Sequence, residues 1–196
     1  RKVIDAPDCE VDLLPHPQTD DVSRFVAEYD AFAQSKGIPL ADPGFLHELQ
    51  SLDHLALIHL RHPDGTPYCC GAIVVLPERA YCLYGSSSFR SVEDPETRKR
   101  SADAVRLMYW HLLVHAKDRG CRVFDLGGYA NGGNGADKSG IDDFKRAFRA
   151  IPTREYCFYH ARTWKGWLVL AALRVTKKKI SNWDDGELPL SRSRLD

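Results

Sequence analysis

The chain has 196 residues, enough for one globular domain with a sizeable core. Its 43% hydrophobic and 28% charged residues are typical of an ordinary soluble protein, and its 27 basic and 27 acidic residues cancel. This balance excludes attraction of nucleic acid or acidic lipid by net charge. An anionic ligand must therefore be held by a local cluster.

Two further classes are excluded by the distribution of apolar residues and cysteines. The longest strongly apolar run, 167–173, is far shorter than the ~20 residues that span a bilayer, so we expect no integral membrane segment. The first residues contain no signal-peptide core. The six cysteines have neither CxxC spacing nor the density of a secreted scaffold, which indicates a reduced, cytoplasmic protein.

Two helices are predicted first. The earlier one ends before Gly37, and Thr19 or Asp20 can cap its start. A shorter helix begins at Asp42-Pro43, where proline suits the first helical turn. The apolar stripe of the first helix consists of Val22, Phe25, Val26, Tyr29, Phe32 and Ala33.

Three strands on short turns are predicted next, over 54–61, 67–76 and 80–86. The first turn, 62–65, contains Pro63 and Gly65, which supply the fixed φ and the positive φ that tight turns require. Consecutive strands on short turns favour an antiparallel meander.

The second half alternates helices and strands. A long helix begins at Asp94-Pro95 and ends near Gly120. The remaining predicted elements are a strand over 121–126, a helix over 141–149, a strand over 154–162 and a helix over 163–180. The order predicts an α/β fold with a central mixed antiparallel and parallel sheet and helices on both faces. We expect one domain over 1–180, followed by a polar tail over 181–196.

One double motif carries a family resemblance. The segment Phe124-Asp125-Leu126-Gly127-Gly128 is followed, after a gap, by Gly140-Ile141-Asp142-Asp143-Phe144-Lys145-Arg146-Ala147-Phe148. This pair resembles the signature of the Fem-type aminoacyl transferases, which have the GNAT acyltransferase architecture. One departure is that Arg149-Ala150 stands where the family usually has glycine after the second phenylalanine.

The resemblance implies a function and a set of site residues. Fem proteins move an amino acid from aminoacyl-tRNA to an amine of a peptidoglycan precursor, and single-domain relatives occur in natural-product pathways. An N-aminoacyltransferase of this kind forms a peptide bond and needs no further cofactor. The segment 80–88 looks like the family's Tyr-x-x-x-Gly-x-Ser strand end, and the family also has a tryptophan-bearing helix. Candidate substrate contacts are therefore Tyr84, Ser87, Trp110, Gly127, Gly128, Tyr129 and Phe144.

Lys145 and Asp125 are the candidate catalytic residues. The resemblance places the family's functional lysine at Lys145, and an ammonium there can stabilise the oxyanion formed when an amine attacks an ester. The alternative is a solvated lysine on a short helix. Asp125 could hold the attacking ammonium, or act as base if burial raises its pKa. Equally, it could cap the loop by accepting backbone N–H bonds.

The glycines and phenylalanines of the motif also have two interpretations. Gly127 and Gly128 permit close approach of a ligand to the backbone, or simply a tight turn. Phe144 and Phe148 lie four residues apart and share a helix face, so they are core residues or, for Phe144, part of the channel wall beside Lys145.

A basic cluster near the start of the long helix is the candidate phosphate or tRNA contact, and it is formed by Arg98, Lys99 and Arg100. GNAT proteins that use acyl-CoA hold the pyrophosphate here on a glycine-containing loop. The segment 95–104 contains no glycine, which disfavours acyl-CoA as the donor. Acyl-CoA-dependent N-acyl transfer and a non-catalytic GNAT-like binding module remain the alternatives. The eight histidines have no metal-ligand spacing, so no metal is expected.

Overall fold

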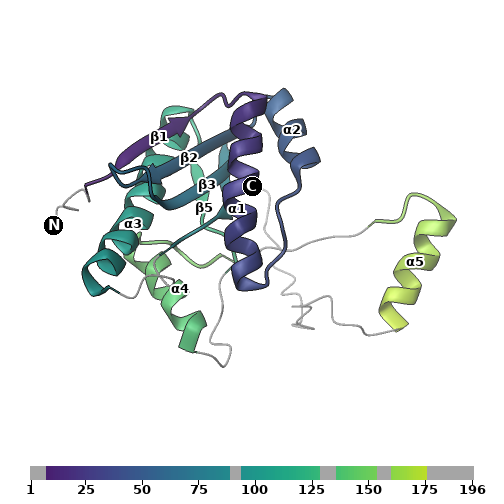
Figure 1. The fold of residues 1–196 in the computed structure, drawn as a ribbon. Coiled ribbons are helices and arrows are strands. Elements are labelled where there is room, and N and C mark those ends of the chain that lie inside the picture. The colour runs from purple at the N-terminus through teal and green to yellow at the C-terminus, as the bar shows by residue number, and fades with distance from the viewer. Residues whose placement is uncertain (1–7, 89–93, 129–135, 154–159, 176–196) are drawn as a thin grey trace, which may run out of the picture. The chain divides into compact units, whose positions relative to one another are not determined.

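The computed structural model describes residues 8–88, 94–128, 136–153 and 160–175 (Figure 1). The chain forms two compact units, 1–151 and 152–196, and each is described by itself. The predicted boundary between one domain and a tail at residue 180 stays a prediction. None of the helices in the described part of the chain combines the length and apolarity that a bilayer crossing needs.

A five-stranded mixed sheet is the centre of the first unit. Its strands lie in chain order: β1 (Glu10–Leu14), β2 (Leu55–Arg61), β3 (Pro67–Val75), β4 (Arg79–Gly85) and β5 (Val123–Asp125). The first four are antiparallel neighbours, and β5 pairs parallel to β4. This confirms the predicted meander and mixed sheet. Strand β1 was not predicted, because its five residues show only a short alternation and most of its side chains are exposed at a sheet edge.

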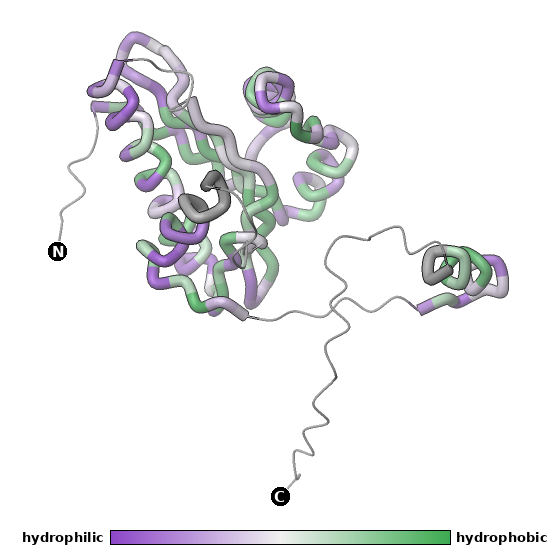
Figure 2. Tube along the Cα trace, turned by 90° about the horizontal axis from the view of Figure 1, so that it is seen from below, coloured by the Kyte–Doolittle hydropathy of each residue, from purple (hydrophilic) through white to green (hydrophobic). Residues whose placement is uncertain are grey.

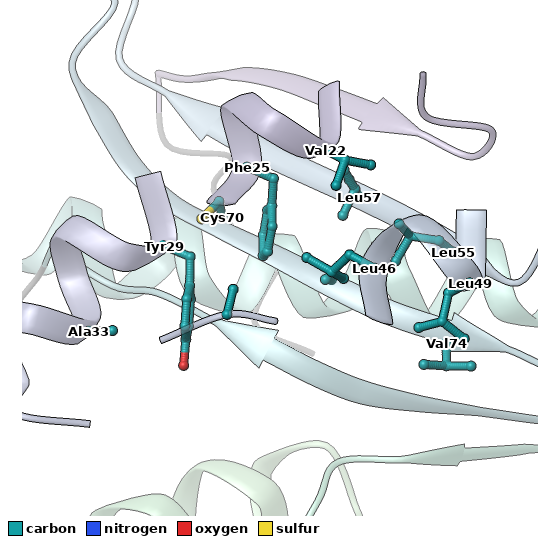
Figure 3. Close-up of a cluster of buried hydrophobic side chains, with 12 residues drawn as sticks. Val22, Phe25, Tyr29, Ala33, Leu46, Leu49, Leu55, Leu57, Cys70 and Val74 are labelled. Carbon is teal, nitrogen blue, oxygen red and sulfur yellow. The ribbon is translucent and has the colours of Figure 1, made fainter. Parts of the chain in front are cut away.

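One face of the sheet is covered by α1 (Thr19–Lys36) and α2 (Pro43–Ser51) (Figure 1). Both helices were predicted. Asp42 caps α2 by accepting the Phe45 N–H at 3.0 Å, but α1 is capped by Gln18 rather than by Thr19 or Asp20. The Gln18 N–H donates to the Asp21 carboxylate at 2.8 Å, so the first turn is closed one residue earlier than expected. Figure 3 shows this core, which includes Val22, Phe25, Tyr29, Leu46, Leu49, Leu55, Leu57, Cys70 and Val74.

The other face is covered by α3 (Pro95–Asp118), which connects β4 to β5. Asp94 caps it by accepting the Thr97 N–H at 2.8 Å, and Pro95 begins it, as predicted. The side chains that α3 buries against β2 and β3 recur at helical spacing: Ala104, Met108, Leu112 and Ala116. Figure 2 shows the resulting layers, with the apolar colour concentrated in the central strands.

A glycine on β3 allows α3 to approach the sheet. A Cβ added at Gly71 would lie 3.1 Å from Met108 Sδ and 3.3 Å from Ile58 Cγ2. We expect Gly71→Ala to destabilise the protein by about 1–3 kcal/mol through overpacking, measured by urea unfolding. The matched control is Gly85→Ala at the register partner of Gly71, where a Cβ would meet only Tyr109 Oη at 3.6 Å. Equal stability of the two variants would contradict close packing of α3.

A bulge in β4 changes which way its side chains point. Ala72 pairs with Tyr84 and Ile73 pairs with Cys82, so Leu83 is the extra residue. Leu83 and Tyr84 consequently both pack on the α1 and α2 side, while Cys82 packs on the α3 side. A regular strand would have placed Cys82 and Tyr84 on one face.

A polar cluster lies between α1 and β2. His59 on β2 is fully buried, and its Nδ1 lies 2.7 Å from the Glu28 carboxylate. Arg61 pairs with the other oxygen of that carboxylate. Among the described residues, the Nε2 atom of His59 has no hydrogen-bond partner. Burial, reinforced by the charge of Arg24, lowers the pKa of His59 to about 4.

Two further helices are α4 (Ala136–Ala147) and α5 (Trp164–Val175). The helix predicted over 141–149 therefore begins five residues earlier and ends at Ala147. Of the strand predicted over 154–162, residues 154–159 lie outside the described residues and 160–162 are not a strand. Helix α5 lies within the predicted 163–180, and 176–180 are outside the described residues.

Candidate active site

The strands β4 and β5 pair over only three residues. Arg79, Ala80 and Tyr81 of β4 face β5, whereas the rest of β4 has a described strand partner only on its β3 side. The edge from Cys82 to Gly85 is thus the point where two neighbouring strands separate. The motif residues that follow β5 lie beside this point.

Asp125 ends β5 and fixes the turn that follows. One carboxylate oxygen lies 2.6 Å from Arg79 Nη2, and the other accepts the Gly127 N–H at 2.7 Å. Gly127 has φ +79°, a conformation that a side chain would strain. Burial acts to raise the pKa of Asp125, but the bonds from Arg79 and Gly127 and the charges of Arg79 and Lys145 outweigh it, so this pKa is lowered. The condition for Asp125 to act as base is not met, and its observed contacts are those of a loop cap.

Lys145 joins the two halves of the motif. Its Nζ, carried by the last turn of α4, donates to the carbonyl oxygens of Gly127 at 2.8 Å and Gly128 at 2.5 Å. The side chain is half-buried, and burial lowers its pKa, opposed by the charges of Asp142, Asp125 and Cys82. An ammonium has three N–H donors, so these two bonds leave one for a further acceptor.

Tyr109 of α3 contacts α4 and the separating edge of β4. Its ring lies 5.1 Å from that of Phe144 and 6.1 Å from that of Phe148, and the two phenylalanines are 5.2 Å apart. Phe144 and Phe148 therefore pack as the core that anchors α4. The Tyr109 hydroxyl bonds to the Cys82 thiol, and burial raises the pKa of Tyr109, so it stays a neutral hydrogen-bond donor.

The same arrangement of sheet and helices occurs in known acyltransferases. The sequence matches the family described as acetyltransferase (GNAT) domain over residues 1–146. The chain belongs to this GNAT family. Membership makes it an acyltransferase of the GNAT class, and the predicted GNAT-like fold is confirmed. No curated protein matches the sequence.

Solved structures resemble this GNAT domain in fold at low sequence identity. An aminoglycoside acetyltransferase from an uncultured soil metagenomic sample has a TM-score of 0.54 at 10% identity, with 79% of this chain and 99% of that chain covered. An aminoglycoside 6'-N-acetyltransferase from Acinetobacter baumannii has a TM-score of 0.50 at 14% identity, with 79% and 99% covered. A probable acetyltransferase has a TM-score of 0.52 at 7% identity, with 79% and 97% covered.

Three predicted substrate contacts of the GNAT domain lie on β4, just beyond β4 and on α3. Tyr84 packs 4.8 Å from the Tyr29 ring and accepts the Asp42 N–H at 3.1 Å, so the bulge places it on the opposite face of the sheet. Trp110 is 51% exposed on α3, beside Tyr109. Ser87 is half-buried just beyond β4. Tyr129 lies outside the described residues.

The basic cluster of Arg98, Lys99 and Arg100 is exposed in the first turns of α3. Ser101, next along the helix, lies 3.5 Å from Ser88 beyond the end of β4, so the cluster is on the side of the sheet where β4 ends. Its predicted contact with phosphate or tRNA stays a prediction. Within the described residues no group of histidine, cysteine, aspartate and glutamate side chains could hold a metal ion.

A cavity of about 150 Å³ lies elsewhere, and its lining contains none of the predicted site residues. It is bounded by Leu52, Asp53, His54, Val75, Leu76, Pro77 and Arg119. The candidate active site is defined by the contacts of Lys145, Asp125 and Tyr109.

Sequence reasoning missed Arg79 and Tyr109. The sequence places Arg79 in the turn after Leu76, whereas it is the first residue of β4, and its contact with Asp125 depends on the parallel pairing of β4 with β5. Tyr109 could have been found, since it lies four residues from Val105 and three from Leu112, beside the apolar stripe of α3.

Arg149 occupies the position where the resemblance predicts glycine. It has φ +58°, and the Arg149 and Ala150 N–H groups close α4 on the carbonyls of Arg146 and Lys145. Arginine is strained in this left-handed conformation. We expect Arg149→Gly to raise the free energy of unfolding by about 1 kcal/mol, measured by urea unfolding.

The control for this prediction is Arg146→Gly. Arg146 lies in the last turn of α4, where the backbone is still helical and glycine is expected to destabilise by up to about 1 kcal/mol. A fall in stability for Arg149→Gly as well would show that the arginine side chain makes contacts worth more than the strain.

Proposed function

We propose that this GNAT domain is an N-aminoacyltransferase that moves an amino acid from aminoacyl-tRNA to an amine of a peptide, a peptidoglycan precursor or a natural product. The Fem-type resemblance suggests this donor. The observation that supports the proposal most directly is the bond from Lys145 Nζ to the Gly127 and Gly128 carbonyls, because it joins the two motif halves at the edge where β4 and β5 separate.

The reaction requires attack of an amine on an ester. The amine nitrogen bonds to the ester carbonyl carbon, and the carbonyl oxygen becomes an oxyanion that the remaining N–H of Lys145 can stabilise. The bond between that carbon and the tRNA ribose oxygen then breaks. The proton lost by the nitrogen passes to the ribose oxygen. No covalent enzyme intermediate is needed.

Asp125 and Arg79 have a positioning role in this scheme. Their pairing fixes the end of β5, and the Asp125 bond to the Gly127 N–H shapes the turn whose carbonyls hold Lys145. The lowered pKa of Asp125 keeps it anionic and a weak base. The incoming amine therefore enters in its neutral form or loses its proton to water.

The donor is tested by incubating the protein with radiolabelled aminoacyl-tRNAs and a pool of amines. We expect label to move from tRNA to an amine in wild type, and roughly 30- to 1,000-fold more slowly in Lys145→Ala. If no label leaves any tRNA while acetyl-CoA is consumed, the aminoacyl-tRNA proposal is wrong.

Acyl-CoA-dependent N-acyl transfer is the second candidate. It is favoured by the match to the acetyltransferase (GNAT) family and by the fold shared with proteins described as aminoglycoside acetyltransferases. The absence of glycine from 95–104 counts against it, since the pyrophosphate loop of acyl-CoA enzymes contains glycine. Titration calorimetry with CoA separates the aminoacyl-tRNA and acyl-CoA candidates, because measurable binding of CoA to the protein favours the acyl-CoA candidate.

A further inference from the structure

The cavity of about 150 Å³ has two charged side chains in its wall, Asp53 and Arg119. Arg119 Nη2 lies 3.1 Å from one carboxylate oxygen of Asp53, and His16 Nδ1 lies 2.6 Å from the other. The bond from His16 is the largest of the causes that lower the pKa of Asp53, so this carboxylate is anionic at neutral pH. The cavity wall therefore carries a fixed pair of opposite charges.

Both members of this pair keep bonding capacity for a ligand. Each carboxylate oxygen of Asp53 accepts one of these two bonds, and an ionised carboxylate has about four acceptor positions in all. In the described part of the chain, the bonds of the Arg119 guanidinium all come from Nη2, which leaves the N–H groups of Nε and Nη1. The pair can thus donate to an anionic group of a ligand and accept from a cationic one.

Two helix ends meet at the same cavity. Leu52 is the C-cap of α2 and Arg119 is the C-cap of α3, and both line the cavity. A helix C-terminus carries partial negative charge, which favours a cation nearby. The charges of Asp53 and Arg119 also cancel, so a ligand with only a negative charge is a poor match for this site.

The rest of the wall is apolar and open to solvent. Val75 and Pro77 line it, together with Leu52 and Leu76, which are 55% and 36% exposed. A cavity of this volume holds a group of about six carbon atoms. The ligand that fits is small, has an aliphatic part and carries one charge of each sign.

We propose that this cavity binds a free aliphatic α-amino acid, with its carboxylate on Arg119, its ammonium on Asp53 and its side chain against the apolar wall. A zwitterion is complementary to the site because it brings both signs of charge to a pair that has both. The cavity lies at the turn before β4, whereas the candidate active site lies where β4 ends, so this is a second site. The proposal does not depend on which acyl donor the GNAT domain uses.

Titration of the full ¹⁵N-labelled chain with leucine, followed by NMR, tests the proposal. We expect saturable shifts of the Leu52, His54 and Leu76 amide signals, with a dissociation constant of about 1 mM or tighter. The probes 4-methylpentanoate and isopentylamine each lack one charged group of leucine and should bind at least about tenfold more weakly. Equal binding of either probe would overturn the proposal, as would leucine shifts confined to the Gly127 and Gly128 amides.

Variants of the charged pair give the second part of the test. Asp53→Asn and Arg119→Gln should each weaken leucine binding at least about tenfold. Asp53 has φ +55°, a conformation that asparagine also adopts, so Asp53→Asn preserves the local backbone. Arg122→Gln is the matched control, because it removes the next arginine along the chain, which is exposed and outside the cavity wall. Wild-type affinity in Asp53→Asn would overturn the proposal, and so would equal weakening in Arg122→Gln.

Discussion

Replacing Lys145 with alanine is expected to raise the barrier of the transfer reaction by about 2–4 kcal/mol, or roughly 30- to 1,000-fold in kcat/KM. The loss follows from removing a cation that contacts the glycine pair and has a donor left for the oxyanion. Steady-state kinetics with the donor identified by the labelling experiment provides the measurement. A loss of less than about threefold would show that Lys145 acts only on the loop.

Two comparisons separate a chemical role for Lys145 from a structural one. Arg146→Ala removes the neighbouring exposed cation, which pairs with Asp143, and should retain wild-type kinetics. The pH profile gives the second comparison. Because burial lowers the pKa of Lys145, the wild-type rate should fall at alkaline pH as the ammonium loses its proton, and Lys145→Ala should lack that limb.

Acidification from about pH 7 to about pH 4.5 is expected to remove about 2 kcal/mol of stability through His59 alone. Its folded pKa of about 4 is below the ordinary histidine pKa of 6.5, so the unfolded chain binds the extra proton first. Stability from this group is therefore complete above pH 6.5 and is lost as the pH falls toward 4. The adjoining Glu28 carboxylate favours the charged imidazole and reduces the loss, although Arg61 shares that carboxylate.

Urea unfolding of wild type and His59→Gln at several pH values measures this effect. Glutamine retains a donor for Glu28 but does not titrate, so the variant should have a shallower dependence on pH. His160→Gln, at an exposed histidine, should keep the wild-type dependence. If the free energy of unfolding depends on pH in the same way for wild type and His59→Gln, other groups cause the loss of stability in acid.

Local signals in the sequence predicted most of the fold. The Asp-Pro pairs at 42–43 and 94–95 located two helix starts because a cap and a proline act within one turn. Strand β1 was not predicted, because an exposed edge strand buries too few side chains to produce a clear alternation of apolar and polar residues. The bulge at Leu83 was not predicted either, because a bulge depends on how two strands pair and not on the residues of one strand.

The candidate site was predicted in part. The resemblance located Lys145 and the glycine pair, and the structure brings them into contact. The resemblance suggested Tyr84 as a substrate contact, but it could not show that the bulge at Leu83 turns Tyr84 toward Tyr29. The role of Asp125 could not be settled from sequence, because its pKa depends on Arg79, 46 residues away, and on a turn geometry that only the folded chain defines.

The chain-order arrangement of the sheet has a consequence for biosynthesis. Each of the first four strands pairs with the next strand in the chain. Only the β1–β2 pair has helices, α1 and α2, between its two strands among these antiparallel pairs. This part of the sheet therefore forms mainly from segments close in sequence, which favours fast folding. The contact between Lys145 and the glycine pair also requires β5 to pair with β4, and α3 lies between these two strands in the chain. Under the proposed role of Lys145, a ribosome-bound chain that stops short of α4 can form its sheet before it has the lysine for catalysis.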